Sequence, residues 1–211
     1  MSFVGGVGYS NIDLIYSGLD RLPDKGEEIF ARGFSMQFGG GIPATMINLS
    51  RLGVESRIIT FAGHDLFSEF VKKTLNSYPV KTVNLYKGNK MPVVLSSTLL
   101  YCGDRSFISY TDGMDLNDAV MDEVYENLKG AYVVDMHVGF LDVYKRLKKD
   151  GCIQIFDTGW EDDLTLEKYK DYLEIADYYI PNQKEAMKIT GTSSVEEAAD
   201  ILSEFFSDVT I

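Results

Sequence analysis

Apolar and polar residues follow two alternating patterns along the chain. Five short runs are rich in β-branched and aromatic residues, which is typical of buried strands: residues 3–7, 57–61, 131–136, 152–156 and 177–180. The segments between them place apolar residues at helical spacing, as in the segment that follows Asp65, a candidate helix N-cap. This repeated alternation predicts an α/β fold with a doubly wound, mostly parallel sheet and helices on both of its faces.

Two stretches do not fit this alternation, residues 28–38 and residues 91–110. In the second stretch, Cys102-Gly103-Asp104 separates two runs of strand-type residues, which indicates a β-hairpin. Antiparallel ribbons inserted into an α/β domain commonly serve as a lid or as an oligomer interface. We therefore expect a small antiparallel β lid beside the main sheet.

Length and charge limit the classes of function. The 211 residues show no internal repeat or linker and are expected to form one domain. The net charge of -12 opposes binding to nucleic acid or to an anionic membrane surface, and no apolar run approaches the roughly 20 residues of a membrane span. The N-terminus has no basic segment before an apolar stretch, so we expect no signal peptide. Cys102 and Cys152 lie in separate apolar contexts without metal-type spacing, so we expect a cytoplasmic protein with two free, buried thiols.

A run of three glycines is the strongest candidate for ligand binding. Gly39, Gly40 and Gly41 precede Pro43, which suits the first turn of a helix. Glycines let a ligand approach the main chain, and the free N–H groups of the first helical turn would face that ligand. A tight strand-to-helix turn without any ligand explains the same pattern equally well. No lysine follows at the distance that a phosphate-binding P-loop requires.

Asn11 and Asp13 directly follow the first predicted strand. They are therefore expected near the carboxyl edge of the sheet, where open α/β folds bind ligands. A carboxylate at this edge is able to accept hydrogen bonds from two hydroxyl groups of a polyol, although an aspartate in a surface turn gives the same pattern. Asn11 also stands where a dinucleotide fingerprint needs its third glycine, which disfavours a dinucleotide-dependent oxidoreductase.

Six short motifs, in order along the chain, resemble the ribokinase (PfkB) family of carbohydrate and nucleoside kinases. They are residues 8–13, Leu22-Pro23 with Gly26-Glu27, Gly39-Gly40 through Arg51-Leu52-Gly53, Gly63-His64-Asp65, Gly103-Asp104-Arg105, and Asn182 with Glu185. The resemblance extends from residue 3 to about residue 202. It implies one ribokinase-like α/β domain over residues 1–211, with lid segments at about 9–37 and 91–110 and a sugar bound between sheet and lid. The lid ribbons are also suited to form a homodimer.

The resemblance assigns binding roles to individual residues. Those that would hold the sugar come from the end of the first strand, the glycine segment with its helix, and the second lid segment: Asn11, Asp13, Gly39, Gly40, Gly41, Thr45, Ser96 and Tyr110. The family usually has a substrate-contacting asparagine at the position of Ala44, and Thr45 beside it is included as a substitute for that asparagine. For Ser96 and Tyr110, packing within the lid or a dimer contact is the competing interpretation.

Asn182 and Glu185 match the Asn-x-x-Glu motif of the family, which implies ATP and Mg²⁺ as cofactors. The acidic residue of the motif helps to organise the water shell of Mg²⁺ and the phosphates, in keeping with a hard cation that retains most of its waters. The resemblance thus makes both residues nucleotide-binding, with Glu185 an indirect Mg²⁺ ligand. On the residues alone, Asn182 is equally a helix N-cap after Pro181, with Glu185 in the first turn.

The second signature of the family, which supplies the catalytic base and a phosphate-binding helix N-terminus, is missing. Asp157-Thr158-Gly159 begins like it, but Trp160-Glu161-Asp162 follows where small residues are required, and the two carboxylates would repel a phosphate. Asp157 is better interpreted as the polar end of the preceding strand. Residues 208–211 resemble the start of a further strand, so we expect the chain to be C-terminally incomplete, with no catalytic residue of its own.

Together these patterns favour the substrate-binding portion of an ATP-dependent kinase that phosphorylates a hydroxyl group of a carbohydrate or related polyol. The alternative is a non-catalytic sugar- or nucleoside-binding protein of the same fold, which explains the missing signature without truncation. Hexose, ribose, nucleoside and sugar acid all stay open as acceptors, because the spacing of motifs does not determine which lid side chains face the ligand.

Overall fold

The computed structural model describes residues 2–206, so the strand expected at residues 208–211 lies outside the described part. The chain divides into two compact units. The first unit comprises Met1–Val7, Gly53–Arg57 and Leu116–Ile211, and the second comprises Gly8–Leu52 and Ile58–Asp115. Throughout the described residues, every helix is too short or too polar to cross a membrane.

The first unit is built from alternating strands and helices. In chain order these are β1 (Phe3–Val7), α3 (Asp118–Leu128), β8 (Ala131–Met136), α4 (Leu141–Lys149), β9 (Ile153–Phe156), α5 (Leu166–Ile175), β10 (Tyr178–Tyr179), α6 (Gln183–Thr190) and α7 (Val195–Leu202). The four strands pair in parallel, in the order β10-β9-β8-β1. Val134 and Phe156 of this sheet and Leu147 of α4 are completely buried, so the apolar runs of the sequence form the core.

The second unit contains two further helices and most of the remaining strands. These elements are β2 (Asn11–Leu19), β3 (Gly33–Gly39), α1 (Gly41–Arg51), α2 (Leu66–Leu75), β5 (Lys81–Asn84), β6 (Val94–Tyr101) and β7 (Asp104–Tyr110). β4 (Ser56–Thr60) spans the boundary between the units, and the six-stranded sheet has the order β10-β9-β8-β1-β4-β5. Asp65 caps α2 as predicted, since its Oδ1 accepts hydrogen bonds from the N–H groups of Phe67 and Ser68 at 3.0 Å each. The predicted fold class is confirmed.

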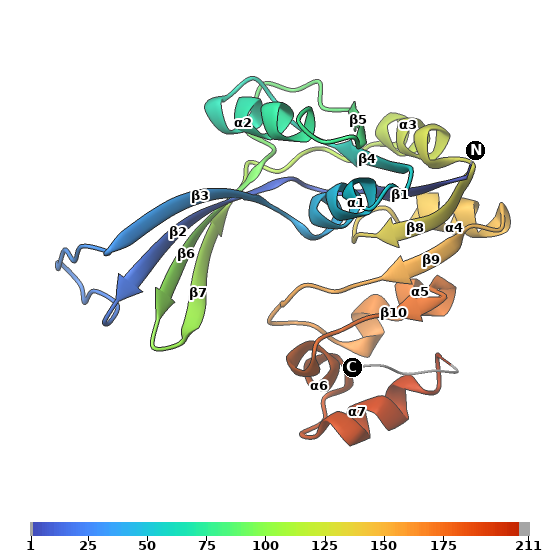
Figure 1. Cartoon of the computed structure of the whole chain (residues 1–211). Coiled ribbons are helices and arrows are strands. Elements are labelled where there is room, and N and C mark those ends of the chain that lie inside the picture. Colours follow the sequence, from blue (N-terminus) through green and yellow to red (C-terminus); the bar gives the residue numbers. More distant parts are fainter. Residues whose placement is uncertain (1, 207–211) are drawn as a thin grey trace. The chain divides into compact units, whose positions relative to one another are not determined.

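A separate four-stranded sheet, with the order β3-β2-β6-β7, extends from the second unit as a long curved ribbon (Figure 1). The pairs β2–β3 and β6–β7 are antiparallel, as expected for two ribbons. β2 and β6 pair in parallel, so the sheet is mixed rather than purely antiparallel. The difference arises because the two ribbons join along their first strands, which run in the same direction.

The predicted hairpin turn lies between β6 and β7. Cys102 and Gly103 have φ angles of 50° and 80°, and the pair Tyr101–Asp104 closes the turn. Two central residues with positive φ define a type I′ turn, which matches the twist of the flanking strands. The expectation that both thiols are buried is wrong for Cys102, because this turn exposes its side chain. Cys152 is buried, and burial raises the pKa of its thiol to about 11.

The four-stranded sheet has two different faces, because side chains alternate along each strand and cross-strand partners share a face. We call one the polar face; it carries Asn11, Asp13, Gln37, Gly39, Ser96 and Ser109. The opposite, apolar face carries Leu14, Tyr16, Phe34, Met36, Leu95, Leu99, Ile108 and Tyr110. A ligand that hydrogen-bonds to this sheet through its hydroxyl groups is therefore expected on the polar face.

Candidate functional site

The glycine segment forms a sharp connection from β3 to α1. Gly40 is the residue before the helix, with φ 99° and ψ 137°, and a Cβ atom there would lie 2.8 Å from the backbone oxygen of Tyr9. A side chain is therefore excluded at Gly40 on both conformational and steric grounds. Around Gly41, by contrast, a Cβ atom would meet nothing within 4 Å. Pro43 lies in the first turn of α1, as predicted.

The N-terminal end of α1 has no side-chain cap. Ala44 donates its N–H group to the oxygen of Gly40 at 3.0 Å, whereas no hydrogen bond among the described residues uses the N–H groups of Gly41 and Ile42. These two donors lie in the first turn, where the helix dipole favours electron-rich ligand atoms. The Thr45 hydroxyl donates to the oxygen of Gly41 at 3.1 Å, so it is engaged within its own helix.

Asn11 and Asp13 lie next to each other on the polar face, close to Gly39. The Asn11 amide nitrogen, Nδ2, donates to Asp13 Oδ1 at 2.9 Å. Asp13 Oδ2 lies 2.7 Å from the position that a Cβ atom of Gly39 would take, so the missing side chain of Gly39 leaves room for the carboxylate. Partial burial raises the pKa of Asp13 above its ordinary value. One carboxylate oxygen is thus held by Asn11, while no hydrogen bond of the described residues occupies the other.

Ser96 joins this pair and brings in a residue that sequence reasoning missed. The Ser96 hydroxyl lies 3.3 Å from Asn11 Nδ2 and 2.8 Å from the Ser109 hydroxyl. Ser96 is buried and Ser109 is exposed. Thr98, the next residue of β6 on this side, has a buried hydroxyl without a hydrogen-bond partner in the described structure. Nothing in the sequence marks an exposed strand serine as a binding residue. The available signal was the two-residue turn at Cys102-Gly103, because its register pairs Ser109 with Ser96.

Tyr110 does not join this group. It pairs with Leu95 across β6 and β7, and so belongs to the apolar face, opposite to Ser96. Its hydroxyl donates to Asp112 Oδ1 at 2.7 Å, and this bond raises the pKa of Tyr110 and lowers that of Asp112. The competing interpretation, a role in packing or in a dimer contact, fits this position better than contact with a ligand on the polar face.

The first unit holds a second candidate site, made of carboxylates. Asp157 directly follows β9, as predicted for the polar end of a strand. Burial raises its pKa to about 6, and the negative charges of Glu185 and Asp135 contribute to the shift. Glu185 and Asp135 are therefore both close enough to act on the charge of Asp157, and a cation near Asp157 would offset both the burial and this repulsion.

Asn182 and Glu185 form a complete capping box at the start of α6. The Asn182 side chain accepts from the Glu185 N–H at 3.0 Å, and Glu185 Oε2 accepts from the Asn182 N–H at 3.0 Å. The helix-capping interpretation of these residues is thus confirmed, and their role toward a nucleotide stays a prediction. The box uses Oε2 of Glu185, and no described residue hydrogen-bonds its Oε1.

The carboxylates suit a cation that keeps its waters. Among residues 2–206, no group of three or more His, Cys, Asp or Glu side chains is arranged to hold a metal ion directly. Asp157 and Glu185 are nevertheless close enough for their charges to interact. Mg²⁺ commonly binds through one or two carboxylates while retaining several waters, so this arrangement fits Mg²⁺.

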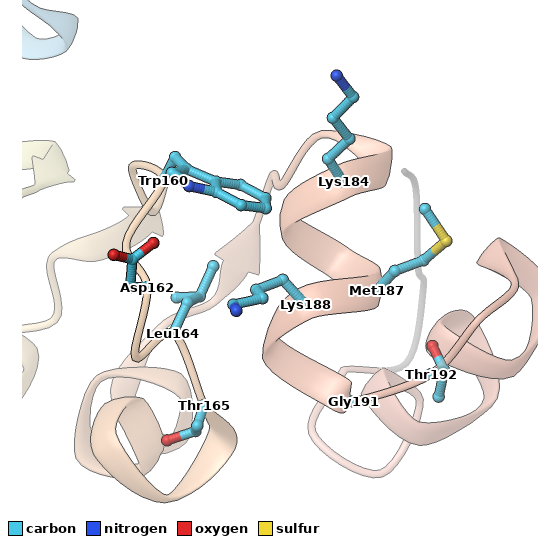
Figure 2. Close-up of a pocket in the computed structure, with 9 residues that line it drawn as sticks. All are labelled: Trp160, Asp162, Leu164, Thr165, Lys184, Met187, Lys188, Gly191 and Thr192. Atoms are coloured by element: carbon cyan, nitrogen blue, oxygen red, sulfur yellow. The ribbon is translucent and has the colours of Figure 1, made fainter.

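Ion pairs hold the loop that follows β9 against the neighbouring helix. Glu161 and Asp163 both pair with Lys168 of α5. On the other side of the loop, Trp160 and Lys188 of α6 line a pocket of about 530 Å³, with the ammonium 5.7 Å from the ring centre. Figure 2 shows the Lys188 side chain directed from α6 toward this loop. The segment that begins like the second family signature is therefore an anchored loop between two helices.

Replacing Asp157 by asparagine is expected to change the pH dependence of stability. The pKa of Asp157 is about 6 in the folded protein, above the ordinary 3.8, so the folded state holds this proton more tightly than the unfolded state. The cost of the buried charge is absent below about pH 4 and fully present above about pH 6. Urea denaturation should show Asp157→Asn to be more stable than the wild type at neutral pH, with the difference lost near pH 4. The exposed Asp162→Asn is the control, and a difference independent of pH would contradict the prediction.

Solved structures with the same architecture include ribokinases. Arabidopsis thaliana ribokinase, in a structure described as a complex with ribose and ATP, has a TM-score of 0.75 and 21% sequence identity, covering 98% of this chain and 70% of that chain. Giardia lamblia ribokinase has a TM-score of 0.80 and 18% identity, covering 97% of this chain and 66% of that chain. The parallel sheet with its helices and the mixed four-stranded sheet thus define a ribokinase-like fold.

The family follows from the sequence match. The model of the pfkB family of carbohydrate kinases matches residues 1–210, and the chain belongs to this family. A candidate sugar kinase of Pyrococcus horikoshii is 35% identical over 92 residues, which amount to 41% of this chain and 30% of that protein. The chain therefore spans only part of the length of its relatives.

Proposed function

We propose that this chain is the acceptor-binding part of an ATP-dependent sugar kinase, with Asp13 as the central acceptor ligand. The observation that carries the proposal is the Asp13 carboxylate, which Asn11 holds by one oxygen, while none of residues 2–206 hydrogen-bonds the other oxygen beside Gly39. An ionised carboxylate only accepts hydrogen bonds, so the free oxygen suits a hydroxyl group. Gly39 leaves room for the Asp13 carboxylate, and Gly41 leaves space for a sugar ring against the main chain.

The remaining acceptor contacts would come from the backbone of α1. The N–H groups of Gly41 and Ile42 lie in the first turn and are not used by described residues. They would donate to ring or hydroxyl oxygens of the acceptor, while Asp13 accepts from its hydroxyl groups. The two kinds of contact together orient the acceptor, which supplies much of the catalytic advantage in phosphoryl transfer.

Family membership and a neighbour described as bound to ribose and ATP support ATP as a cofactor, and the paired carboxylates of Asp157 and Glu185 support Mg²⁺. ATP would supply the phosphoryl group, and Mg²⁺ would neutralise its developing charge. Glu185 and Asp157 would hold the hydrated cation, and Asn182 would keep Glu185 in place through the capping box. The catalytic base is expected outside these 211 residues.

The rival function is a sugar-binding protein that does not transfer phosphate. To separate the two, the open reading frame that contains this chain is sequenced beyond the codon for Ile211 and its product is assayed. A kinase is expected to continue with a Gly-Ala-Gly-Asp motif and to release ADP in the presence of Mg²⁺ and sugar. A stop codon after Ile211, together with sugar binding that causes no ADP release, would favour the rival.

The apolar face supports a second part of the proposal, a homodimer formed through the four-stranded sheet. Phe34, Met36, Ile108 and Tyr110 are 61%, 41%, 69% and 60% exposed. Large apolar side chains grouped on one side of a sheet usually mark an interaction surface. A second copy of the chain offers the same apolar face, so an isologous contact would cover all of these side chains at once.

Replacing Ile108 by aspartate is expected to convert this dimer to a monomer, because it places a charge in the middle of the covered surface. Analytical ultracentrifugation measures the change. Leu66→Asp is the matched control, since Leu66 is 79% exposed at the start of α2 and lies outside the sheet. A wild-type protein that is monomeric at micromolar concentration would contradict the proposed dimer.

A further inference from the structure

Four side chains form a hydrogen-bonded chain across three strands of the polar face. An ionised Asp13 accepts from Asn11 Nδ2, which fixes the orientation of the amide. The same nitrogen lies 3.3 Å from the Ser96 hydroxyl, which lies 2.8 Å from the Ser109 hydroxyl. Since Ser96 is buried and Ser109 is exposed, the chain has two open ends, Asp13 Oδ2 and the Ser109 hydroxyl. One ligand with two suitably spaced polar groups would occupy both ends.

The charges near these four hydrogen-bonded side chains disfavour a negatively charged ligand. Asp13 is the carboxylate of the polar face, and partial burial already raises its pKa. Arg105 is the basic residue on the same side of the sheet, but it lies four residues from Ser109, about 13 Å along the strand. A sugar acid bound to Asp13 would bring a second carboxylate without a cation beside it.

The aromatic residues of the sheet are placed unfavourably for a nucleobase. Tyr16, Phe34 and Tyr110 all belong to the apolar face. Phe107 of β7 is on the side of Ser109 and is 54% exposed, but it pairs with Thr98 rather than with Ser96, and the Arg105 guanidinium lies 5.8 Å from its ring centre. The two cross-strand partners of Asp13 are Gln37 and Ser96, which carry an amide and a hydroxyl group. A nucleobase, by contrast, gains its affinity mainly from stacking on exposed rings.

We infer that the acceptor is a neutral, polyhydroxylated sugar rather than a sugar acid or a nucleoside, and that Ser109 binds one of its hydroxyl groups. This inference rests on the proposed acceptor site at Asp13. Ser109 acts as a specificity residue, because it is the exposed end of the hydrogen-bonded series whose other end, Asp13, holds the acceptor. Ser96 is the buried link between the two ends, so its role is to position Ser109 and Asn11.

Two matched pairs of ligands test the acceptor class by isothermal titration calorimetry with the wild-type chain. D-glucose and D-glucuronate differ in one carboxylate, and D-ribose and inosine differ in the base. The neutral sugar of each pair is expected to bind at least about tenfold more tightly. Equal or tighter binding of glucuronate or inosine would overturn the inference while leaving an acceptor site in place. Failure of all four ligands to bind would overturn the proposed function, and the inference with it.

Variants of the sheet test the role of Ser109. Ser109→Ala removes one hydrogen bond and is expected to weaken binding of the neutral sugar by about threefold to tenfold. Ser97→Ala is the matched control, because Ser97 is the neighbour of Ser96 but faces the apolar side, opposite Leu14 and Ile108. Ser109→Lys adds the missing cation and is expected to improve glucuronate binding by about tenfold. Equal sugar affinity of Ser109→Ala and Ser97→Ala would overturn the assignment.

Discussion

Replacing Asp13 by alanine is expected to lower the affinity for the sugar acceptor by about 1.5 to 3 kcal/mol, or roughly 10- to 150-fold. The loss is large because Asp13 offers a charged acceptor, and hydrogen bonds to charged groups are stronger than neutral ones. Isothermal titration with the neutral sugar that binds best measures the change. Binding by the wild type should also weaken as the pH falls through the raised pKa of Asp13, since only the ionised form accepts two hydroxyl groups.

The free energy of unfolding of Asp13→Ala provides the control, because it separates a loss of binding from a loss of folding. Burial disfavours the charged form of Asp13, so removing the charge at neutral pH is not expected to lower the free energy of unfolding. Gln37→Ala is a matched variant, because Gln37 pairs with Asp13 on the polar face and is exposed. Unchanged sugar affinity in Asp13→Ala would remove this residue from the acceptor site.

Replacing Gly40 by alanine is expected to have the largest effect on stability. The backbone at Gly40 has φ 99°, and an added Cβ atom would lie 2.8 Å from the Tyr9 oxygen, which belongs to the backbone and cannot easily move. Such a conformation costs on the order of 1–3 kcal/mol for a residue other than glycine, before the steric overlap is added. Chemical denaturation should therefore show a loss of at least about 2 kcal/mol.

Gly41→Ala is the matched control one residue further along. A Cβ atom at Gly41 meets nothing within 4 Å, and the residue begins α1, where alanine is favourable. Stability is expected to stay the same or to rise. If the acceptor lies against this segment as proposed, Gly41→Ala weakens sugar binding without unfolding the protein. Equal changes in stability for Gly40→Ala and Gly41→Ala would contradict the steric argument, which distinguishes the two positions.

The strands of the main sheet could be predicted because buried parallel strands are continuous apolar runs. β8 (Ala131–Met136) and β9 (Ile153–Phe156) coincide with such runs to within a residue. β5 (Lys81–Asn84) was missed because it is a short strand at the end of the sheet order with mostly polar residues. The parallel pairing of β2 with β6 was also missed, since no local pattern records which ribbon edges meet.

The candidate site divides in the same way. Asn11 and Asp13 could be predicted because they follow a strand directly, and the structure places Ser96 beside them. Tyr110 and Ser109 differ by one position, and one position reverses the face of a strand. The choice between them depends on the register of β6 and β7, which the positive φ angles of the Cys102-Gly103 turn determine.

That turn also makes the chain convenient for spectroscopy. Cys102 presents its thiol at the end of the β6–β7 hairpin, whereas the thiol of Cys152 is buried with a pKa of about 11. A maleimide dye reacts with the accessible thiolate, so it should attach at Cys102 and leave Cys152 unmodified. The natural sequence therefore offers a single labelling position on the four-stranded sheet, at the end of β6 away from Ser96. A fluorophore there would report on ligand binding or self-association without any engineered cysteine.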